Sequence, residues 1–521
     1  MKKLALISVY KKEGIVDFAR DLVEKYDYEL LSTGGTAQLL KTNNIQVTEV
    51  SELTNFPEML EGRVKTLHPV VHGGLLARRD KSEHMETIAK HKIRPIDLVV
   101  INLYPFQEVV SKKNVSLEEA IENIDIGGPS MIRSAAKNYS AVTVICDPSD
   151  LPLVLKELSE NKGQTTLCLR EKLATKAFQK TSEYDQAITG FLSNYAKQSL
   201  NGSQGFFPEN LNFNLKLKRV LRYGENPHQH AALYLPPDSN YGLANAEVLQ
   251  GKELSFNNYL DLESAWTIAS EFDRRTPVAV IVKHNNPCGV AIAPDLHHAF
   301  IEALTCDSIS AFGGIVAFNN NVEVKLAKEL SQIFFEAIIA PDYSEGALEV
   351  FANKPNLRVL KINLTESSIN DLDVKRISQG FLIQEFNQQT LNPENLKVVT
   401  KRKPTDQEML DLAFAWKVCK HVKSNAIVVA TDGKTLGIGA GQTSRIGSVE
   451  IAINQANYNT KNAVLASDAF FPFKDSIEMC ASGKIVAVIQ PGGSIRDKEI
   501  IDACDKYNIA MLFTGIRHFR H

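Results

Sequence analysis

The chain has 521 residues, with 58 basic and 61 acidic side chains and a formal net charge of −3. Its 44% hydrophobic and 23% charged residues are typical of a soluble globular protein, which excludes disordered, collagen-like and membrane-spanning classes. The balanced charge argues against a large basic face for nucleic acid. At roughly 150 residues per domain, the length predicts three to four domains.

The N-terminal residues and the cysteines predict a cytoplasmic protein. Residues 4–9 form an apolar run that is too short for a secretory signal and is followed by lysines, so we interpret it as a first strand. The seven cysteines include no CxxC pair, which argues against a zinc ribbon and a thioredoxin-like redox site. Most stand among apolar neighbours, which favours buried thiols in a reducing compartment.

The first 150 residues alternate between short β-branched runs and helical spacing, as parallel α/β domains do. Ser116 and Glu119 have capping-box spacing, which predicts a helix start. The pattern predicts strands at residues 4–9, 29–32, 97–103 and 141–146, and helices at residues 14–24, 36–40 and 117–124.

A segment rich in Asn, Gly and Ser, residues 197–216, predicts a domain boundary. Beyond it the alternation resumes, and the sequence shows no repeat of 20 to 50 residues. The strands predicted there are residues 278–282, 315–318, 426–430 and 485–489.

Two common nucleotide motifs fail. GIGAGQ has Gln442 where the dinucleotide fingerprint needs its last glycine, and a P-loop ending in TDGKT would need glycine at Val428. A dehydrogenase and a nucleoside triphosphatase are therefore disfavoured.

Two segments of the first half indicate a phosphorylated ligand. STGGT, with Ser32, Gly35 and Thr36, stands between a strand and a helix, where free amides cradle phosphate. An ordinary capped turn remains the alternative. EGRVKTLHPVVHGG (residues 61–74) is a loop with a basic cluster suited to phosphate, although a solvated loop remains the alternative. The cluster comprises Arg63, Lys65, Thr66, His68 and His72.

NLYPF and IDIGGPSMIRSAAKN follow predicted strands or helices. Their polar side chains are expected at strand or helix ends, where α/β sites form. These side chains are Tyr104, Asp125, Arg133 and Lys137.

In the second half, VIVKHNNPCG ends an apolar strand in Lys283 and His284. An imidazole at a strand end, with its neutral-range pKa depressed by an adjacent ammonium, suits a general base, although a structural histidine is the alternative. LRYGENPHQHAALY supplies Arg222 and Tyr223 in a turn. Its pair His228 and His230 resembles half of a metal site, but no third ligand can be assigned.

Two more clusters follow predicted strands. One is polar and rich in glycine, comprising Asn425, Gly439, Gly441, Gln442, Ser444 and Arg445. The other, SDAFFPF, is expected to expose Phe470, Phe471 and Phe473 around Pro472 as an apolar wall for a ring-bearing ligand.

Together these motifs resemble a known family. STGGT, SELTNFPEMLEGRVKTLHP, NLYPF, IDIGGPSMIRSAAKN, LRYGENPHQ, KHNNPCG, SISAFGG, SNAIVV, GIGAGQTSR, SDAFFPF and the terminal RHFRH occur in this order. The order is similar to that of the bifunctional purine biosynthesis enzymes, which join IMP cyclohydrolase to AICAR (phosphoribosylaminoimidazolecarboxamide) formyltransferase. The resemblance spans essentially the whole chain.

The resemblance implies an α/β protein with a methylglyoxal-synthase-like cyclohydrolase domain at residues 1–199. Residues 200–521 would form a duplicated, cytidine-deaminase-like formyltransferase domain without the deaminase zinc. The enzyme would transfer a formyl group from 10-formyl-tetrahydrofolate to AICAR, giving FAICAR, and then close the ring to IMP. It would be a cytoplasmic homodimer with transformylase sites between subunits and without nucleic-acid or membrane partners. No metal is expected for the chemistry, and binding of a monovalent cation is left open.

The resemblance also implies residue roles in formyl transfer. His284 would move the proton, Lys283 would stabilise charge and protonate the leaving folate nitrogen, and Asn425 would orient His284 or the oxyanion. The AICAR phosphate and ribose would be held by Arg222, Tyr223 and Arg445. The rings would be faced by Phe312 and by Phe471, Pro472 and Phe473. Glu336, an aspartate in some relatives, would contact the folate.

For ring closure the resemblance implies a reacting set of Lys65, Tyr104, Asp125 and Lys137. The phosphate would be bound by Ser32, Gly35, Thr36, Arg63 and Thr66. Lys12 is a further substrate-binding residue, whereas Tyr10 replaces the small hydroxyl residue of some members. The competing interpretations are a binding protein built on a decayed enzyme, which the intact reactive side chains disfavour, and a chain with only one active half.

Overall fold

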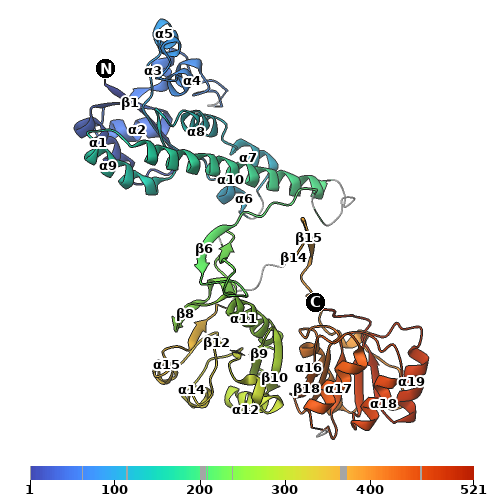
Figure 1. Cartoon of the computed structure of the whole chain (residues 1–521). Helices are drawn as coiled ribbons and strands as arrows, with labels where there is room; N and C mark the ends of the chain where they lie inside the picture. Colours follow the sequence, from blue (N-terminus) through green and yellow to red (C-terminus); the bar gives the residue numbers. More distant parts are fainter. Residues whose placement is uncertain are drawn as a thin grey trace. The chain divides into compact units, whose positions relative to one another are not determined.

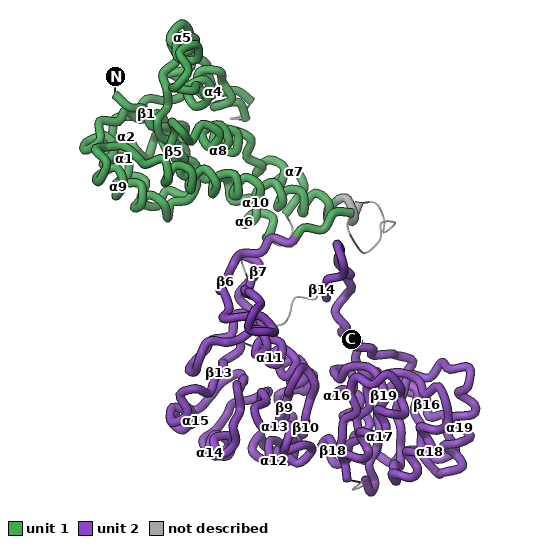
Figure 2. The backbone as a smooth tube through the Cα atoms, in the orientation of Figure 1, with its two compact units in different colours: residues 1–212 green, residues 213–521 purple. Residues whose placement is uncertain are grey.

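The computed structural model describes residues 2–60, 63–112, 115–199, 207, 209–237, 239–363, 372–457 and 460–521. Two compact units make up the chain, residues 1–212 (unit 1) and residues 213–521 (unit 2), shown in Figure 2. The division falls beyond the end of helix α10 (Leu167–Ser199). No helix in the described part of the chain is long and apolar enough to cross a membrane.

Unit 1 contains a five-stranded parallel sheet of order β3-β2-β1-β4-β5. Apart from the two-residue β3, its strands are largely apolar and mostly buried, as parallel strands covered on both faces are. Four of them match predicted strands, although β5 is shorter than the predicted residues 141–146. The strands are β1 (Lys3–Val9), β2 (Tyr28–Ser32), β3 (Thr48–Glu49), β4 (Leu98–Asn102) and β5 (Thr143–Ile145).

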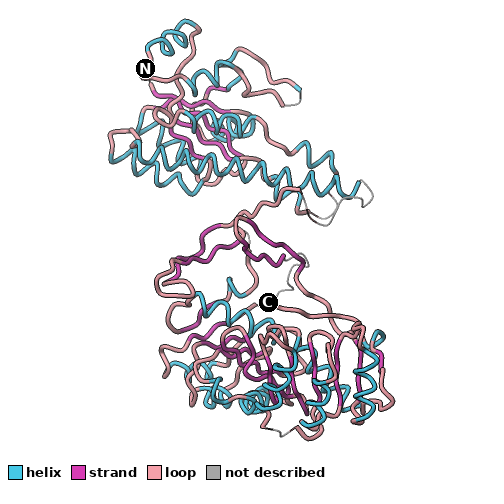
Figure 3. The backbone as a smooth tube through the Cα atoms, turned by 45° about the vertical axis from the view of Figure 1, so that its right-hand side comes forward, coloured by secondary structure: helices cyan, strands magenta, loops and turns pink. Residues whose placement is uncertain are grey.

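Helices cover both faces of this sheet (Figures 1 and 3). The crossover through α1 leads from β1 to β2, whereas the crossover through α8 leads in the opposite direction, from β4 to β5. Because both are right-handed, α1 and α8 lie on opposite faces of the sheet. Helix α9 contacts α1, and α10 contacts α8. The helices of unit 1 are α1 (Ile15–Tyr26), α2 (Gly34–Thr42), α3 (Val50–Thr54), α4 (Pro69–Leu76), α5 (Ser82–Lys90), α6 (Phe106–Val110), α7 (Leu117–Glu122), α8 (Gly127–Lys137), η2 (Pro148–Asp150), α9 (Leu151–Glu160) and α10.

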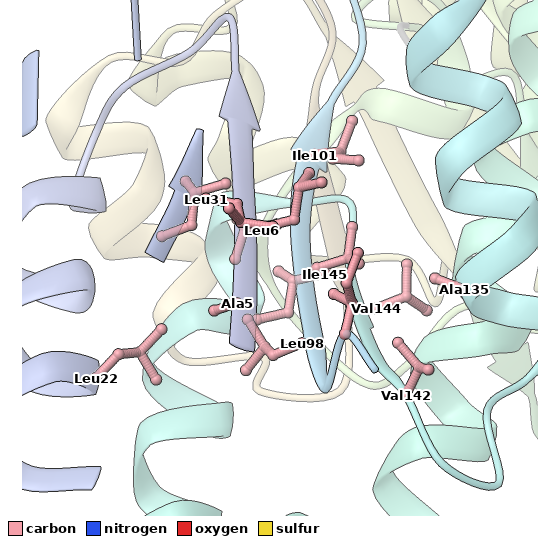
Figure 4. Packing of buried hydrophobic residues seen from close by; sticks show 14 of the residues in the cluster. Ala5, Leu6, Leu22, Leu31, Leu98, Ile101, Ala135, Val142, Val144 and Ile145 are labelled. Carbon is pink, nitrogen blue, oxygen red and sulfur yellow. The ribbon is translucent and has the colours of Figure 1, made fainter. Parts of the chain in front are cut away.

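The core of unit 1 forms where the strands meet these helices (Figure 4). Leu6 and Ile145 come from strands, and Leu22 and Ala135 come from helices on opposite faces. The predicted cap at Ser116 is present, because its hydroxyl accepts the Glu119 N–H at 3.0 Å. Helix α7 ends at Glu122, slightly before the predicted end.

Unit 2 is built on a twelve-stranded mixed sheet of order β16-β21-β20-β19-β17-β18-β10-β9-β11-β12-β13-β8. The predicted strands 278–282, 315–318, 426–430 and 485–489 correspond to β9, β11, β17 and β20. The strands are β8 (Glu247–Gln250), β9 (Val278–Lys283), β10 (Asn286–Ile292), β11 (Ile315–Phe318), β12 (Ala337–Ala340), β13 (Arg358–Lys361), β16 (Lys397–Val398), β17 (Ile427–Thr431), β18 (Lys434–Gly439), β19 (Val464–Ser467), β20 (Ala487–Gln490) and β21 (Ala510–Phe513).

This sheet repeats one topology twice. In each half, an antiparallel hairpin (β9–β10 or β17–β18) is followed outward by one antiparallel pairing (β9–β11 or β17–β19), two parallel pairings and one antiparallel edge strand. The halves meet at β10 and β18, which are antiparallel. The structure therefore contains the duplication that no sequence repeat revealed, whereas the likeness to cytidine deaminases stays a prediction.

The helices of unit 2 follow the same repeat. Side chains of α11 and α16 share one apolar core, whereas α12, α14 and α15 enclose a second core and α17, α18 and α19 a third. The helices are η3 (Leu243–Asn245), α11 (Phe256–Ala269), α12 (Leu296–Cys306), α13 (Ser308–Ala311), α14 (Val324–Leu330), α15 (Glu345–Ala352), η4 (Pro393–Asn395), α16 (Asp406–Cys419), α17 (Arg445–Gln455), α18 (Asp475–Ser482) and α19 (Asp497–Lys506).

Two small antiparallel hairpins complete unit 2. One pairs β6 (Lys216–Leu221) with β7 (Ala231–Leu235), and the other pairs β14 (Leu372–Ile377) with β15 (Gly380–Glu385). Both expose apolar side chains, including Val220, Phe381 and Leu382.

Candidate active sites

The first candidate site lies at the carboxyl edge of the unit 1 sheet. Ile7 of β1 is in register with Ser32 of β2, and Val9 is in register with Asn102 of β4. The chain leaves β1 toward β2 on one side and returns to β4 on the other. This edge is therefore a topological switch point, where open α/β sheets bind ligands.

Two lysines cover the glycine turn at this edge. A Cβ on Gly34 would lie 3.0 Å from the Lys65 Nζ, and one on Gly35 would lie 3.2 Å from the Lys12 Nζ. Glycine thus lets both ammonium groups approach the first turn of α2, whose free amides and dipole favour an anion. Lys65 also pairs with Glu58 at 2.7 Å.

The hydroxyls of STGGT are placed differently from the prediction. Ser32 is fully buried, and its Oγ donates to the Ile7 carbonyl at 2.7 Å. Thr36 is buried, and its Oγ1 donates to the Val9 carbonyl at 3.0 Å and accepts the Val9 N–H at 3.1 Å. These side chains join β2 and α2 to β1. The part of the turn left for phosphate is therefore the backbone at Gly34 and Gly35.

The start of α8 brings three predicted residues together. The Asp125 Oδ1 accepts the Gly128 N–H at 2.8 Å, and the same carboxylate accepts the Tyr104 N–H. Burial raises the pKa of Asp125, although these two amide bonds oppose the rise. The Thr66 Oγ1 lies 2.7 Å from where a Cβ on Gly127 would stand. Thr66, Tyr104 and Asp125 therefore meet at the helix start.

Arg63 and Lys137 stand apart from this cluster. Arg63 is exposed and pairs with Glu122. Lys137 is exposed in the last turn of α8, about 15 Å along the helix axis from Gly127. The structure does not bring Lys137 to Asp125 within one chain, and its role stays a prediction.

Asn102 is a site residue that the sequence reasoning did not single out. Its Oδ1 accepts the N–H groups of Tyr10 and Lys11 at 2.6 and 3.0 Å, and its Nδ2 donates to the Lys11 carbonyl at 2.9 Å. It therefore shapes the loop that carries Lys12. The available signal was its place at the first position of NLYPF, directly at a strand end.

The second candidate site is built around the β9–β10 turn in unit 2. Both turn residues, His284 and Asn285, have left-handed backbones with φ of 52° and 62°. The preceding Lys283 donates from Nζ to the Phe312 carbonyl at 2.8 Å. The turn thus places an ammonium, an imidazole and the exposed Phe312 ring at one end of the sheet.

The second repeat supplies a loop to the same sheet end. The Lys423 N–H donates to the Asn286 Oδ1 at 3.1 Å, which joins the loop before β17 to the hairpin. The Asn425 Oδ1 accepts from Arg445 at 2.7 Å, and its Nδ2 donates to the Gln442 carbonyl at 2.9 Å. Lys283, His284 and Asn425 therefore come from two repeats to one place.

Arg445 holds Asn425 rather than standing free for a ligand. Its Nη1 donates to the Ser467 Oγ at 2.8 Å and to Asp468 at 2.5 Å, and both charged groups are buried. If this guanidinium contacts substrate as predicted, it does so while also bonding Asn425 and Asp468. Asp468, in SDAFFPF, was not recognised from the sequence as its partner.

The C-terminal segment fastens this loop. The Ser424 N–H donates to the Arg520 carbonyl at 2.9 Å, and the Arg520 N–H donates back to the Ser424 Oγ at 3.1 Å. The Arg520 guanidinium donates to the His421 carbonyl at 2.7 Å, and the His518 N–H donates to the Asp468 carbonyl at 3.0 Å. The terminal RHFRH motif is thus part of the site's frame.

The aromatic wall requires a correction. Phe471 is fully buried in the core formed by α17, α18 and α19, so it cannot face a ligand as predicted. Its two neighbours Phe470 and Phe473 are exposed, and Pro472 is half-buried. The Arg496 guanidinium lies over the Phe473 ring, 4.7 Å from its centroid. An unbroken apolar run did not reveal which ring would fill the core.

The other predicted ligand residues of unit 2 lie on separate elements. Arg222 is exposed after β6, with its guanidinium over the Tyr223 ring at 5.4 Å. Glu336 follows α14 and pairs with Arg358 at 2.6 Å. The Phe312 ring stacks against Phe334 at 5.4 Å between centroids.

The pair His228 and His230 does not form a metal-ligand group. In the part of the chain that the structure describes, one cluster has ligand atoms within reach of a common ion, formed by Asp295, His297 and His298. It sits at the start of α12, where Asp295 caps the helix and the positive end of the dipole disfavours a cation.

Comparison with known proteins identifies relatives along the whole chain. A family model described as AICARFT/IMPCHase bienzyme matches residues 135–455, and an MGS-like domain model matches residues 14–130. The bifunctional purine biosynthesis protein PurH of Thermoanaerobacter sp. (strain X514) is 54% identical over 521 residues, covering 100% of both chains. Those of Caldicellulosiruptor saccharolyticus and Listeria monocytogenes (EGD-e) are each 52% identical, again covering 100% of both.

A solved structure, "Crystal structure of ForH", is 34% identical, with a TM-score of 0.34, and covers 37% of this chain and 97% of that one. Fold and sites together define a two-unit α/β enzyme with a candidate site in each unit. The chain belongs to the AICARFT/IMPCHase bienzyme family. It is a bifunctional enzyme of purine biosynthesis, with AICAR formyltransferase and IMP cyclohydrolase activities.

Proposed function

We propose that unit 2 carries formyl transfer at the β9–β10 turn and that unit 1 carries ring closure at its carboxyl edge. The observation that carries this proposal is the bond from the Lys423 N–H to the Asn286 Oδ1, which brings the loop of Asn425 to the turn of Lys283 and His284. Two repeats of unit 2 thereby supply one set of reactive groups.

In formyl transfer, the weakly nucleophilic 5-amino group of AICAR attacks the formyl carbon of 10-formyl-tetrahydrofolate. His284 takes a proton from the attacking nitrogen, as an imidazole acting as general base can. The tetrahedral oxyanion is stabilised by Lys283 and by Asn425, which Arg445 orients. The bond from carbon to the folate nitrogen then breaks, and Lys283 protonates the leaving nitrogen.

The aromatic side chains near the turn support binding of a ring. Phe312 is exposed and adjoins Lys283 through its carbonyl, whereas Phe473 is exposed after β19. We assign Phe312 to the folate or AICAR ring on that basis. Arg222, Tyr223 and Glu336 are proposed to bind substrates on the family resemblance.

In ring closure, the carboxamide nitrogen of FAICAR attacks its own formyl carbon and water leaves. The reaction is intramolecular, so positioning contributes much of the rate. Lys12 and Lys65 beside Gly34 and Gly35 hold the phosphate. Asp125, whose pKa is raised by burial, moves the proton at the start of α8, next to Tyr104 and Thr66.

The hairpin β14–β15 supports the proposal of a homodimer. Ile377, Phe381 and Leu382 are 48%, 65% and 58% exposed on this pair of strands. Apolar side chains gathered on a small hairpin are typical of a contact with a second chain. We place the enzyme in the cytoplasm, since its cysteines are free and five of the seven are buried.

Crossed single variants test the assignment of the two reactions. Formyl transfer is followed as FAICAR formed from AICAR and 10-formyl-tetrahydrofolate, and ring closure as IMP formed from supplied FAICAR. We expect His284→Ala to lower formyl transfer at least roughly 100-fold and to leave ring closure unchanged. Lys65→Ala should do the reverse. A folded His284→Ala chain with wild-type formyl transfer would overturn the proposal.

A further inference from the structure

The turn that carries His284 is held from below by helix α11. The Asn285 N–H donates to the Asp261 Oδ1 at 2.6 Å, a short bond to a charged acceptor. The Ser264 Oγ, one helical turn further on, donates to the Asn285 Oδ1 at 3.3 Å. Both turn residues have left-handed backbones, which L residues adopt at a cost, and these contacts from α11 stabilise that conformation.

The second repeat contains an equivalent contact between its own helix and its own hairpin turn. Asp411 of α16 accepts the Gly433 N–H of the β17–β18 turn at 2.9 Å. Asp261 and Asp411 stand at matching positions, each six residues after the capping-box residue of its helix, Ser255 or Thr405. Both repeats therefore use an aspartate of the helix to bind an amide N–H of the hairpin turn.

The two turns differ in what they carry. The first presents His284 beside the loop of Asn425, whereas the second consists of Asp432 and Gly433. Because β10 and β18 run antiparallel, the second turn lies at the opposite end of the sheet. The same bond therefore supports a reactive turn in one repeat and a turn without proposed chemistry in the other.

We propose that Asp261 is a positioning residue for formyl transfer, which acts by holding the Asn285 N–H and thereby fixing the backbone of His284. The inference rests on the proposed role of His284. The bond from the Asn285 N–H to Asp261 orients the imidazole of His284 through the backbone, and Asp261 itself is not proposed to touch substrate. A base displaced by about 1 Å can lose roughly 100-fold in rate, so a backbone contact is sufficient to matter.

Four variants of the full chain test this inference. We expect Asp261→Ala to lower kcat for formyl transfer by roughly 10- to 100-fold with little change in KM for AICAR. Asp261→Asn keeps an acceptor oxygen in place and should remain within about fivefold of wild type. Asp261→Glu keeps the charge but displaces the oxygen, so it should behave like Asp261→Ala and serves if the alanine variant does not fold. Asp411→Ala, the matched control, should remain within about threefold.

Amide hydrogen exchange supplies a readout that does not depend on activity. We expect Asp261→Ala to accelerate exchange in peptides covering the turn at His284 and Asn285, and Asp411→Ala to accelerate it at Gly433. Asp411→Ala should lower the thermal unfolding temperature at least as much as Asp261→Ala, since Asp411 is buried and also accepts from the Gln407 Nε2 at 3.3 Å.

The outcomes separate this inference from the proposed function. If Asp261→Ala and Asp411→Ala lower formyl transfer equally, or if Asp261→Glu is as active as wild type, positioning by Asp261 is wrong. If instead His284→Ala is fully active, the proposed role of His284 is wrong. A loss of formyl transfer in Asp261→Ala would then have a cause other than the positioning of His284.

Discussion

In both sites, burial and hydrogen bonds set the pKa or the orientation of single side chains. Asp125 lies under the start of α8 with two amide N–H groups on its carboxylate, yet burial dominates and raises its pKa. In unit 2, Arg445 and Asp468 form a buried pair that leaves one guanidinium nitrogen for Asn425. Each site thus depends on hydrogen bonds among its own residues.

The raised pKa of Asp125 predicts an acid limb in ring closure. A carboxyl group with a raised pKa keeps its proton to a higher pH, so the fraction able to accept a proton falls earlier as the pH is lowered. We expect kcat/KM for FAICAR to fall with decreasing pH through a value above about 3.9, the ordinary value for aspartate.

Asp125→Asn is the variant that tests this limb. It keeps an acceptor for the Gly128 N–H but cannot ionise, so ring closure should drop roughly 100-fold and the acid limb should disappear. A pH profile with the same limb in the variant would show that another group titrates. Formyl transfer by the same protein is the control and should be unchanged.

At the scale of elements, the C-terminal segment and the β9–β10 turn hold the site of unit 2. The segment bonds the loop around Ser424 through backbone and side chain, and His518 is itself buried beneath α16, with its ring 5.0 Å from Trp416. Burial, aided by the nearby positive charge of Lys420 and His421, lowers the pKa of His518 to about 4.

Deleting residues 518–521 should release the loop that carries Asn425. We expect formyl transfer to fall more than roughly tenfold, since the bonds of Arg520 to Ser424 and His421 are lost, while ring closure stays within about twofold. His521→Ala is the matched control, because the His521 carbonyl that accepts from Lys375 is kept and its ring contacts the Phe519 ring of the same segment. Equal formyl transfer in the deletion and in wild type would show that the segment does not support the site.

At the scale of the whole molecule, the two units carry separate cores and separate sites. The described apolar clusters of unit 1 include no residue of unit 2. The residues predicted or proposed for ring closure all lie between Lys12 and Lys137. One unit therefore contains both the folding core and the chemistry of that reaction.

Residues 1–212 expressed alone are expected to fold and to convert FAICAR to IMP at a rate within about threefold of the full chain, since domains with their own core fold alone. The isolated unit should form no FAICAR from AICAR. A folded but inactive unit 1, judged by circular dichroism and a cooperative thermal transition, would show that ring closure needs residues beyond 212.

Much of the fold could be predicted from the sequence because β-branched runs and helical periodicity are local signals. The strands at β1, β2, β4, β9, β11 and β20 were predicted close to their observed bounds. The duplication of unit 2 was implied by the family resemblance but by no visible sequence repeat, because the repeats share hydrogen-bonding topology and an aspartate under each turn but not the turn sequence. His284 and Asn285 in one half correspond to Asp432 and Gly433 in the other.

The sequence by itself determined the family and the chemistry, since ordered motifs carry reactive residue types whatever their packing. Only the tertiary structure decided which of these side chains meet. It buried Phe471, turned the Ser32 hydroxyl to β1, placed Lys137 at the far end of α8 and joined Lys423 to Asn286. The physical reason is that packing across the whole sheet decides which way a side chain points and which distant residues bond. Lys423 and Asn286 are 137 positions apart, and no local sequence pattern records such a contact.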